Sequence, residues 1–235
     1  MIPLEEIRRA RERIGDDVLR TPLVPLGRDD RILLKLECLH PIGSFKVRGA
    51  FSAIRAASAS ELANGVVTAS AGNMAQGLAW AAREAGVPAR VIVPWGGGGL
   101  TIGIASALKA LRPDVRVVTA EPETGAPLAA AFAAGEPREI EFTPSWVDGA
   151  GGRALLPGMW EQARELVDEA VVVPLPEVEE AVRLLASRAH VVAEGAGALA
   201  LAAALRRDDR CVCIVSGGNI DPDVYAGILS PAATA

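Results

Sequence analysis

The chain has 235 residues, of which 50% are hydrophobic and 23% charged, and its formal net charge is -5. Such a composition is typical of a globular protein of one or two domains. The acidic balance, with no Lys/Arg run, argues against nucleic acid or an anionic membrane surface as the main partner. No apolar run reaches the roughly 18 residues of a membrane span, and the N-terminus lacks an apolar signal core, so we expect no membrane partner and a cytoplasmic protein.

The N-terminal part of the chain alternates amphipathic segments with short apolar runs. The prolines of RTPLVPL end the first helix, so an extended segment should follow it. Helices are predicted over residues 4–18, 48–63 and 71–86, and strands over residues 31–39, 65–70 and 89–94. The succession of strand, helix and strand from residue 65 to residue 94 predicts a βαβ unit with parallel strands and a right-handed crossover.

The C-terminal part continues the alternation. Helices are predicted over residues 100–111, 127–135, 158–166, 176–187 and 195–207, and strands over residues 115–123 and 211–219. Residues 137–157 are glycine-rich and irregular, and the tail from Ser230 should fray. Repeated alternation of strands and helices makes the predicted fold class α/β.

The three cysteines form an odd set without CxxC spacing. Two of them, Cys211 and Cys213, alternate within an apolar run, and Cys38 stands alone. Buried free thiols are therefore favoured over a disulfide or a zinc site.

The segment GSFKVRGA, residues 43–50, holds the first candidate for chemistry. It places Lys46 between Phe45 and a glycine turn, directly after an apolar strand. A lysine that is partly desolvated by an aromatic neighbour carries more free amine, and such an amine can form a Schiff base with an aldehyde. Taken alone, a solvated lysine after an edge strand is the more common situation.

Three further turns lie at strand ends, where ligands of open α/β sheets bind. The run Gly96, Gly97, Gly98 and Gly99 precedes an apolar helix and predicts a backbone N–H cradle for a phosphate, with a flexible linker as the alternative. The turns SAGNMAQG and SGGN are individually explained by a helix cap and an ordinary loop. Together with Lys46, the three turns supply an amine, a phosphate site, an amide and a hydroxyl.

In this order, SFKVRGA, SAGNMAQG, GGGGL and SGGN resemble the fold type II pyridoxal-phosphate enzymes, especially the threonine/serine dehydratases and serine racemases. ARERIGDDVLRTPLVPL, LLKLECLHPIGSFK, AEPE and VVAEGAGALALAA share the resemblance, which thus covers nearly the whole chain. It implies an open, twisted parallel sheet with helices on both faces, pyridoxal 5'-phosphate as cofactor, an amino-acid substrate and a homodimer.

The resemblance also implies roles for individual residues. Lys46 would hold the cofactor as a Schiff base and act as the catalytic base, with Phe45 against the cofactor ring. The remaining cofactor contacts would be Asn73 at the ring hydroxyl, Gly96, Gly97, Gly98 and Gly99 at the phosphate, Gly149 over the other face of the ring, Ser216 at the pyridine nitrogen, and Glu194 nearby. Ser70 and Asn73 would contact the substrate.

These roles favour elimination of a β-hydroxyl from L-threonine or L-serine, which yields a 2-oxo acid and ammonia. A serine at the pyridine nitrogen cannot keep that nitrogen protonated as a carboxylate would, so less charge is delocalised into the ring. In the racemases a second serine stands where this chain has Ala71. A dehydratase is therefore favoured, with an amino-acid racemase or a non-catalytic, cofactor-binding remnant as alternatives.

Three departures from the family pattern affect this interpretation. Met74 replaces the usual histidine, which removes a donor from the region expected to hold the substrate carboxylate. At VIVPWGGGGL the chain lacks βα units, on the order of 60 to 90 residues. We therefore expect residues 1–49 and 96–235 to form the large domain and residues 50–95 a shortened small domain, with a merger of the two into one domain as the alternative. Glu121 lacks a second acidic ligand, which favours a surface residue and no metal.

Overall fold

The computed structural model describes residues 2–27, 29–40, 43–56, 58, 90–208 and 211–230. The predicted strand over 65–70 and the helix over 71–86, with Ser70, Asn73 and Met74, lie outside these residues, as does the tail after Ser230.

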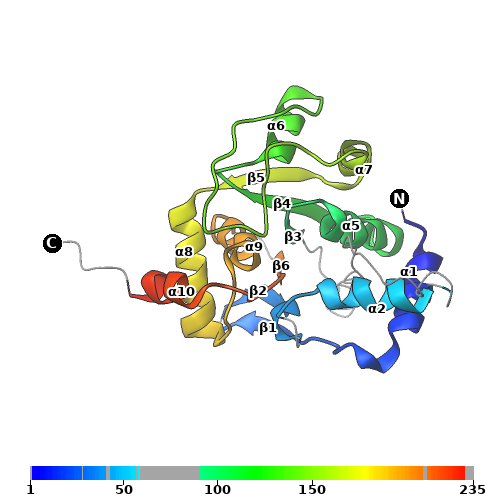
Figure 1. The fold of residues 1–235 in the computed structure, drawn as a ribbon, viewed down its shortest axis with the longest axis horizontal. Helices are drawn as coiled ribbons and strands as arrows, with labels where there is room; N and C mark the ends of the chain where they lie inside the picture. The colour runs from blue at the N-terminus through cyan, green and yellow to red at the C-terminus, as the bar shows by residue number, and fades with distance from the viewer. Residues whose placement is uncertain are drawn as a thin grey trace.

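In the part of the chain that the structure describes, six strands form one central sheet (Figure 1). Its order is β1-β2-β6-β3-β4-β5, with β1 at Leu23–Leu26, β2 at Asp29–Leu36, β3 at Arg90–Pro94, β4 at Arg116–Pro122, β5 at Glu169–Val173 and β6 at Cys211–Val215. The strands from β2 to β5 are parallel, whereas β1 pairs antiparallel with β2. The predicted open α/β sheet is confirmed. Among the described strands, the antiparallel β1 forms an edge, which is a position in a sheet where a proline such as Pro25 is tolerated.

Strand β3 lies inside the sheet, between β6 and β4. The predicted shortened small domain, residues 50–95, includes this strand. Most of that range lies outside the described residues, so the division into two domains stays a prediction.

The apolar core has two layers because the central strands are buried on both faces. On β3, Val91 and Val93 belong to one hydrophobic cluster and Ile92 to the other. On β6, Cys213 packs with Ile92, while its neighbours Val212 and Ile214 pack on the opposite face. This alternation explains why the central strands read as continuous apolar runs in the sequence.

Helices cover both faces of the sheet. Figure 1 shows α8, α9 and α10 gathered on one side and α1, α5 and α7 on the other. The helices are α1 (Leu4–Ile14), α2 (Lys46–Ala56), α5 (Gly99–Leu111), α6 (Pro127–Ala134), α7 (Met159–Leu166), α8 (Leu175–Leu184), α9 (Gly195–Leu205) and α10 (Pro222–Leu229). Short helical turns are η1 (Gly15–Asp17), η2 (Glu37–Leu39) and η3 (Leu185–Ala189).

The sequence predicts neither β5 nor α10, and it predicts β1 only as an extended segment. Strand β5 is only five residues long and stands directly between two helices. The start of α10 has an N-cap sequence that could have predicted the helix. The Asp221 side chain accepts hydrogen bonds from the N–H groups of Asp223 and Val224, and Pro222 occupies the first turn.

None of the three cysteines forms a disulfide; Cys211 and Cys213 are buried as predicted, whereas Cys38 is only half-buried. None of the helices in the described part of the chain combines the length and the apolar character that a membrane span needs.

Candidate functional site

The candidate site lies at the edge of the sheet where the parallel strands have their carboxyl ends. Leu36 at the end of β2 pairs in register with Val215 at the end of β6, and Pro94 at the end of β3 pairs with Ala120 of β4. The Lys46 turn follows β2, the glycine run follows β3 and the SGGN turn follows β6. Strand order alone therefore brings the three turns to one edge of the sheet.

Backbone hydrogen bonds join the Lys46 turn to the SGGN turn. The Phe45 N–H donates to the carbonyl of Ser216 at 3.3 Å, and the Gly218 N–H donates to the carbonyl of Gly43 at 2.8 Å. An isolated antiparallel bridge between Ser44 and Gly217 completes the contact. The position of Lys46 relative to the buried Ser216 is thus set by main-chain geometry.

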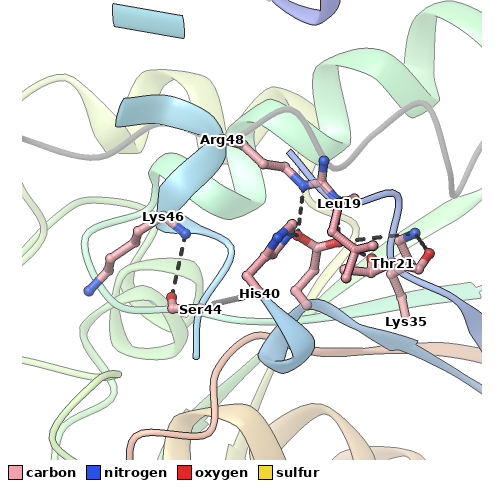
Figure 2. A network of polar contacts seen from close by, with 8 residues as sticks. Leu19, Thr21, Lys35, His40, Ser44, Lys46 and Arg48 are labelled. Atoms are coloured by element: carbon pink, nitrogen blue, oxygen red, sulfur yellow. Dashed lines mark hydrogen bonds and ion pairs between the residues drawn. The ribbon is translucent and has the colours of Figure 1, made fainter. Parts of the chain in front are cut away.

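Lys46 is the exposed member of the three lysines in the chain. Lys35 is buried and donates to the carbonyl of Thr21, and Lys109 pairs with Asp168 at 2.9 Å. The Lys46 side chain points away from the buried polar residues around Glu37, while its backbone N–H donates to Ser44 Oγ at 3.4 Å (Figure 2). Of the three amines, that of Lys46 is the one most open to an incoming aldehyde.

The expected desolvation of Lys46 by Phe45 is wrong. Phe45 is buried and packs in the hydrophobic cluster that contains Trp95 and Leu100. Lys46 remains exposed beside it.

The glycine run forms a cradle that side chains would fill. Gly98 is the N-cap of α5 in the left-handed region, with φ of 86°, and offers no side-chain cap. A Cβ at Gly98 would lie 2.9 Å from both Met159 Sδ and the Trp95 ring, whereas Gly97 is exposed. The first turn of α5 contains no acidic residue. Backbone N–H groups at the positive end of this helix suit an anion such as a phosphate.

Glu194 links the SGGN turn to the loop that contains Gly149. Its backbone N–H donates to the carbonyl of Gly217 at 3.2 Å, and its Oε2 accepts from the N–H of Asn219 at 3.0 Å. A Cβ on Gly149 would lie 3.5 Å from Glu194 Oε1. The pKa of Glu194 is raised, mainly by burial and also by the negative charge of Asp148. The hydrogen bond from the Asn219 N–H and the positive charge of Lys46 lower the pKa but do not cancel this effect.

The loop around Gly149 also meets the glycine run. The Gly151 N–H donates to the carbonyl of Trp95 at 2.7 Å, and a Cβ on Gly96 would lie 3.0 Å from the carbonyl oxygen of Gly149. The structure thus brings together the turns that contain Lys46, Gly96–Gly99, Gly149, Glu194 and Ser216. Ser70 and Asn73, the remaining predicted contacts, lie outside the described residues.

Glu121 is a buried helix cap, which corrects the expected surface position. Its carboxylate accepts from the N–H groups of Leu128 at 3.0 Å and Ala129 at 2.7 Å, at the start of α6. Burial raises its pKa to about 7, against the effect of these two bonds. Among the described residues, no three His, Cys, Asp or Glu side chains lie close enough together to hold a metal ion. The absence of a metal site stays a prediction.

A buried polar network around Glu37 was not found from the sequence. Its carboxylate accepts from Arg48 Nε at 2.7 Å, from Arg48 Nη2 at 2.9 Å and from the Thr21 hydroxyl, and lies 3.0 Å from His40 Nε2 (Figure 2). Burial alone would raise the pKa of Glu37, but the bonds from His40, Arg48 and Thr21 outweigh it and hold the pKa at about 2. Glu37 is therefore a buried carboxylate anion.

We expect Glu37 to make folding sensitive to acid. A carboxyl whose pKa is lower in the folded chain stabilises that chain above its unfolded pKa of 4.5, and this contribution is lost as the pH falls through about 2. The difference corresponds to about 3 kcal/mol at neutral pH. Denaturant unfolding of the wild type and Glu37→Gln at pH 7 and pH 3 should show the gap between the two proteins shrinking by roughly 2 kcal/mol. A gap that does not change with pH would assign the acid sensitivity to other groups.

Comparison with known proteins agrees with this geometry. The family model described as "Pyridoxal-phosphate dependent enzyme" matches residues 14–94 and 87–217. The two matches share residues 87–94, the segment that contains β3. An L-threonine ammonia-lyase of Thermotoga maritima is 29% identical over 98% of this chain and 79% of its own length, and its alignment of 315 positions exceeds the 235 residues of this chain.

Solved structures have the same fold. The T.th. threonine deaminase superposes with a TM-score of 0.77 at 32% identity and covers 93% of this chain and 98% of its own. Maize serine racemase superposes with a TM-score of 0.78 at 27% identity, over 95% of this chain and 96% of its own. With most of its length matched by the family model, and with the amine, the glycine cradle and the SGGN turn gathered at one sheet edge, this chain belongs to the pyridoxal-phosphate dependent enzymes.

Proposed function

We propose that this chain, with pyridoxal 5'-phosphate as cofactor, eliminates the β-hydroxyl of L-threonine or L-serine as water. Hydrolysis of the resulting enamine takes up one water and gives a 2-oxo acid and ammonia. The observation that carries the proposal is the fixed position of an exposed lysine, Lys46, beside the SGGN turn and at the same sheet edge as the glycine cradle. The activities named for the T. maritima ammonia-lyase and the T.th. threonine deaminase support the same reaction.

The residues present fit the cofactor. The open backbone at Gly97 and the uncapped start of α5 suit its phosphate, and the exposed Lys46 amine suits its aldehyde. When bound, the cofactor supplies an electron-withdrawing ring that makes the α-proton of an attached amino acid more acidic.

The chain's own groups then have distinct tasks. Lys46 Nζ accepts the α-proton of the substrate, since it is the exposed amine at the site. The Ser216 hydroxyl offers a neutral hydrogen-bonding group at the end of β6, and a neutral group favours elimination over transamination. The Glu194 carboxylate, which accepts a hydrogen bond from the Asn219 N–H, places an acidic group close enough to interact with the charge of Lys46.

The choice between elimination and racemisation is open to a direct test. We expect the cofactor-loaded protein, incubated with L-serine, to release pyruvate and ammonia in equal amounts and to form little D-serine. D-serine as the main product would replace the proposal by a racemase, the function named for the maize neighbour. Neither product, under conditions where the cofactor is bound, would indicate a non-catalytic remnant.

We expect Gly97→Asp to weaken cofactor binding about tenfold or more, because it places a carboxylate beside the phosphate. Gly97 is exposed, and a Cβ there would meet the exposed Leu156 side chain at 3.3 Å, so the added bulk is readily accommodated. Gly97→Asn has nearly the same shape without the charge and is the matched control. Fluorescence or absorbance titration with pyridoxal phosphate measures both affinities. Equal affinities of the Gly97→Asp and Gly97→Asn variants for pyridoxal phosphate would contradict the assignment of the phosphate site to this turn.

Further features follow from the same resemblance as proposals. We expect a homodimer in the cytoplasm, and a large domain of residues 1–49 and 96–235 with residues 50–95 as the shortened small domain.

The shortening and Met74 should weaken the apparent affinity for the substrate, since fewer groups hold its carboxylate. We expect Met74→His to improve that affinity without changing the affinity for the cofactor, as measured by substrate-dependent ammonia release. An unchanged substrate affinity in Met74→His would show that residue 74 does not contribute to substrate binding.

A further inference from the structure

We propose that Glu37 and Arg48 are positioning residues, which hold the first turn of α2 so that the Lys46 amine faces the site. This inference rests on the proposed function, because it assigns the cofactor-binding amine to Lys46. The side-chain hydrogen bonds of Glu37 and Arg48 go to Leu19, Thr21, His40 and each other, and none of these bonds reaches the glycine cradle or the SGGN turn.

The Glu37 carboxylate connects segments that are separate in the chain. It receives hydrogen bonds from Thr21, before β1, and from Arg48, in the first turn of α2, and it lies against His40, just after η2. Glu37 itself directly follows β2 and is fully buried. The carboxylate thus ties the first turn of α2 to the end of a strand in the central sheet.

The Arg48 contact fixes direction as well as distance. Two nitrogens of the guanidinium meet the two carboxylate oxygens, and Nη2 also donates to the carbonyl of Leu19 at 3.0 Å. Such a two-point contact restrains both planes, which a single point charge does not. The first turn of α2 is therefore held in one orientation.

Lys46 and Arg48 lie on different sides of the same helical turn. Residues two apart in an α-helix point in nearly opposite directions. The Arg48 side chain donates to Glu37, and Figure 2 shows the Lys46 side chain directed away from that of Arg48. Arg48 therefore restrains the helix from behind the amine. From the other side, the backbone bonds of Phe45 and Gly43 hold the turn to Ser216 and Gly218.

A buried ion pair is a costly way to add stability, because apolar residues of similar volume often stabilise a core as well or better. What the pair provides here is a defined geometry for the turn that bears the amine. In this proposal the glycine cradle binds the phosphate, and the Glu37–Arg48 pair orients the Lys46 amine toward the aldehyde.

The test compares capture of pyridoxal phosphate with binding of pyridoxine 5'-phosphate, which has the phosphate and ring but no aldehyde. The variants are Glu37→Gln and Arg48→Lys; the latter keeps the charge and loses the two-point contact. Capture is followed by absorbance and by borohydride trapping, and analogue binding by calorimetry, at temperatures where each variant is folded. We expect at least tenfold slower or weaker capture, with analogue affinity within about twofold of the wild type.

Leu185→Ala is the control for lost stability alone. Leu185 is fully buried in the cluster that contains α8 and α9 residues and belongs to η3, outside the site. We expect this variant to unfold at lower temperature with capture unchanged. If Glu37→Gln does not fold, Arg48→Lys carries the comparison.

Two outcomes would overturn the positioning role. One is wild-type capture by Arg48→Lys, which would show that the two-point contact is not needed. The other is an equal loss of capture and of analogue affinity, which would indicate general damage to the site. Failure of the proposed function is a different result, since the wild type itself would then fail to capture pyridoxal phosphate or to release ammonia from L-threonine.

Discussion

Lys46→Arg is expected to abolish covalent capture of pyridoxal phosphate and to reduce ammonia release from L-threonine by about a thousandfold or more. Arginine keeps the positive charge and much of the length of the side chain, but its guanidinium neither forms the Schiff base nor accepts a proton near neutral pH. The loss of a positioned general base alone typically costs about 10² to 10⁴ in rate. Turnover is measured with saturating cofactor, so that weak binding does not hide residual activity.

Lys109→Arg is the matched control for that substitution. Lys109 lies at the end of α5, pairs with Asp168 and donates to the carbonyl of Val115 at 3.2 Å, and arginine can make similar contacts. We expect wild-type capture and turnover in this variant. If Lys46→Arg retains more than a few per cent of wild-type turnover while Lys109→Arg loses it, the catalytic amine has been assigned to the wrong lysine.

The second large effect is expected from Gly197→Ala, which should destabilise the fold and displace the SGGN turn. Gly197 lies in the first turn of α9, and a Cβ there would overlap the backbone carbonyl oxygen of Gly217, directly after Ser216. The clash is with main chain, so no side-chain rotation relieves it. Overpacking of this kind costs about 1 to 3 kcal/mol, even though alanine is otherwise the better helix former. We expect lower denaturation midpoints and weaker cofactor binding together.

Gly227→Ala provides the opposite expectation for the same change. Gly227 is in α10, and a Cβ there meets nothing within 4 Å. The substitution should leave stability unchanged or raise it by up to about 1 kcal/mol, with no effect on the cofactor. If both variants behave alike, the close approach of α9 to the SGGN turn does not constrain the site.

The sequence was sufficient to predict the central strands β2, β3, β4 and β6 and the gathering of Lys46, Gly96–Gly99 and Ser216. Gly96 and Ser216 closely follow β3 and β6, and Lys46 follows β2 through η2. Because parallel strands end at a common edge, local patterns predict this long-range arrangement. The predicted shortness of the chain is confirmed, since its alignment with the T. maritima ammonia-lyase extends over 315 positions, whereas the location of the shortening at VIVPWGGGGL stays a prediction.

Other features depend on packing that no local pattern records. Glu37 and Lys35 look like the polar positions of a half-exposed strand, and only the fold shows that both are buried around Arg48. Glu121 appears at a strand end as a surface residue, but α6 begins above it and takes its carboxylate as a cap. The exposure of Lys46 depends likewise on where Phe45 packs, which is set by residues far away in the sequence.

The central claim is that Lys46 holds the cofactor, and the most direct measurement is to locate the amine that does so. The protein is loaded with pyridoxal phosphate, reduced with borohydride, digested and analysed by mass spectrometry. Because the chain contains only Lys35, Lys46 and Lys109, each candidate lysine gives a distinct modified peptide. We predict stoichiometric modification of the peptide that contains Lys46. Modification at Lys35 or Lys109 instead, or no stable adduct at saturating cofactor, would contradict this account.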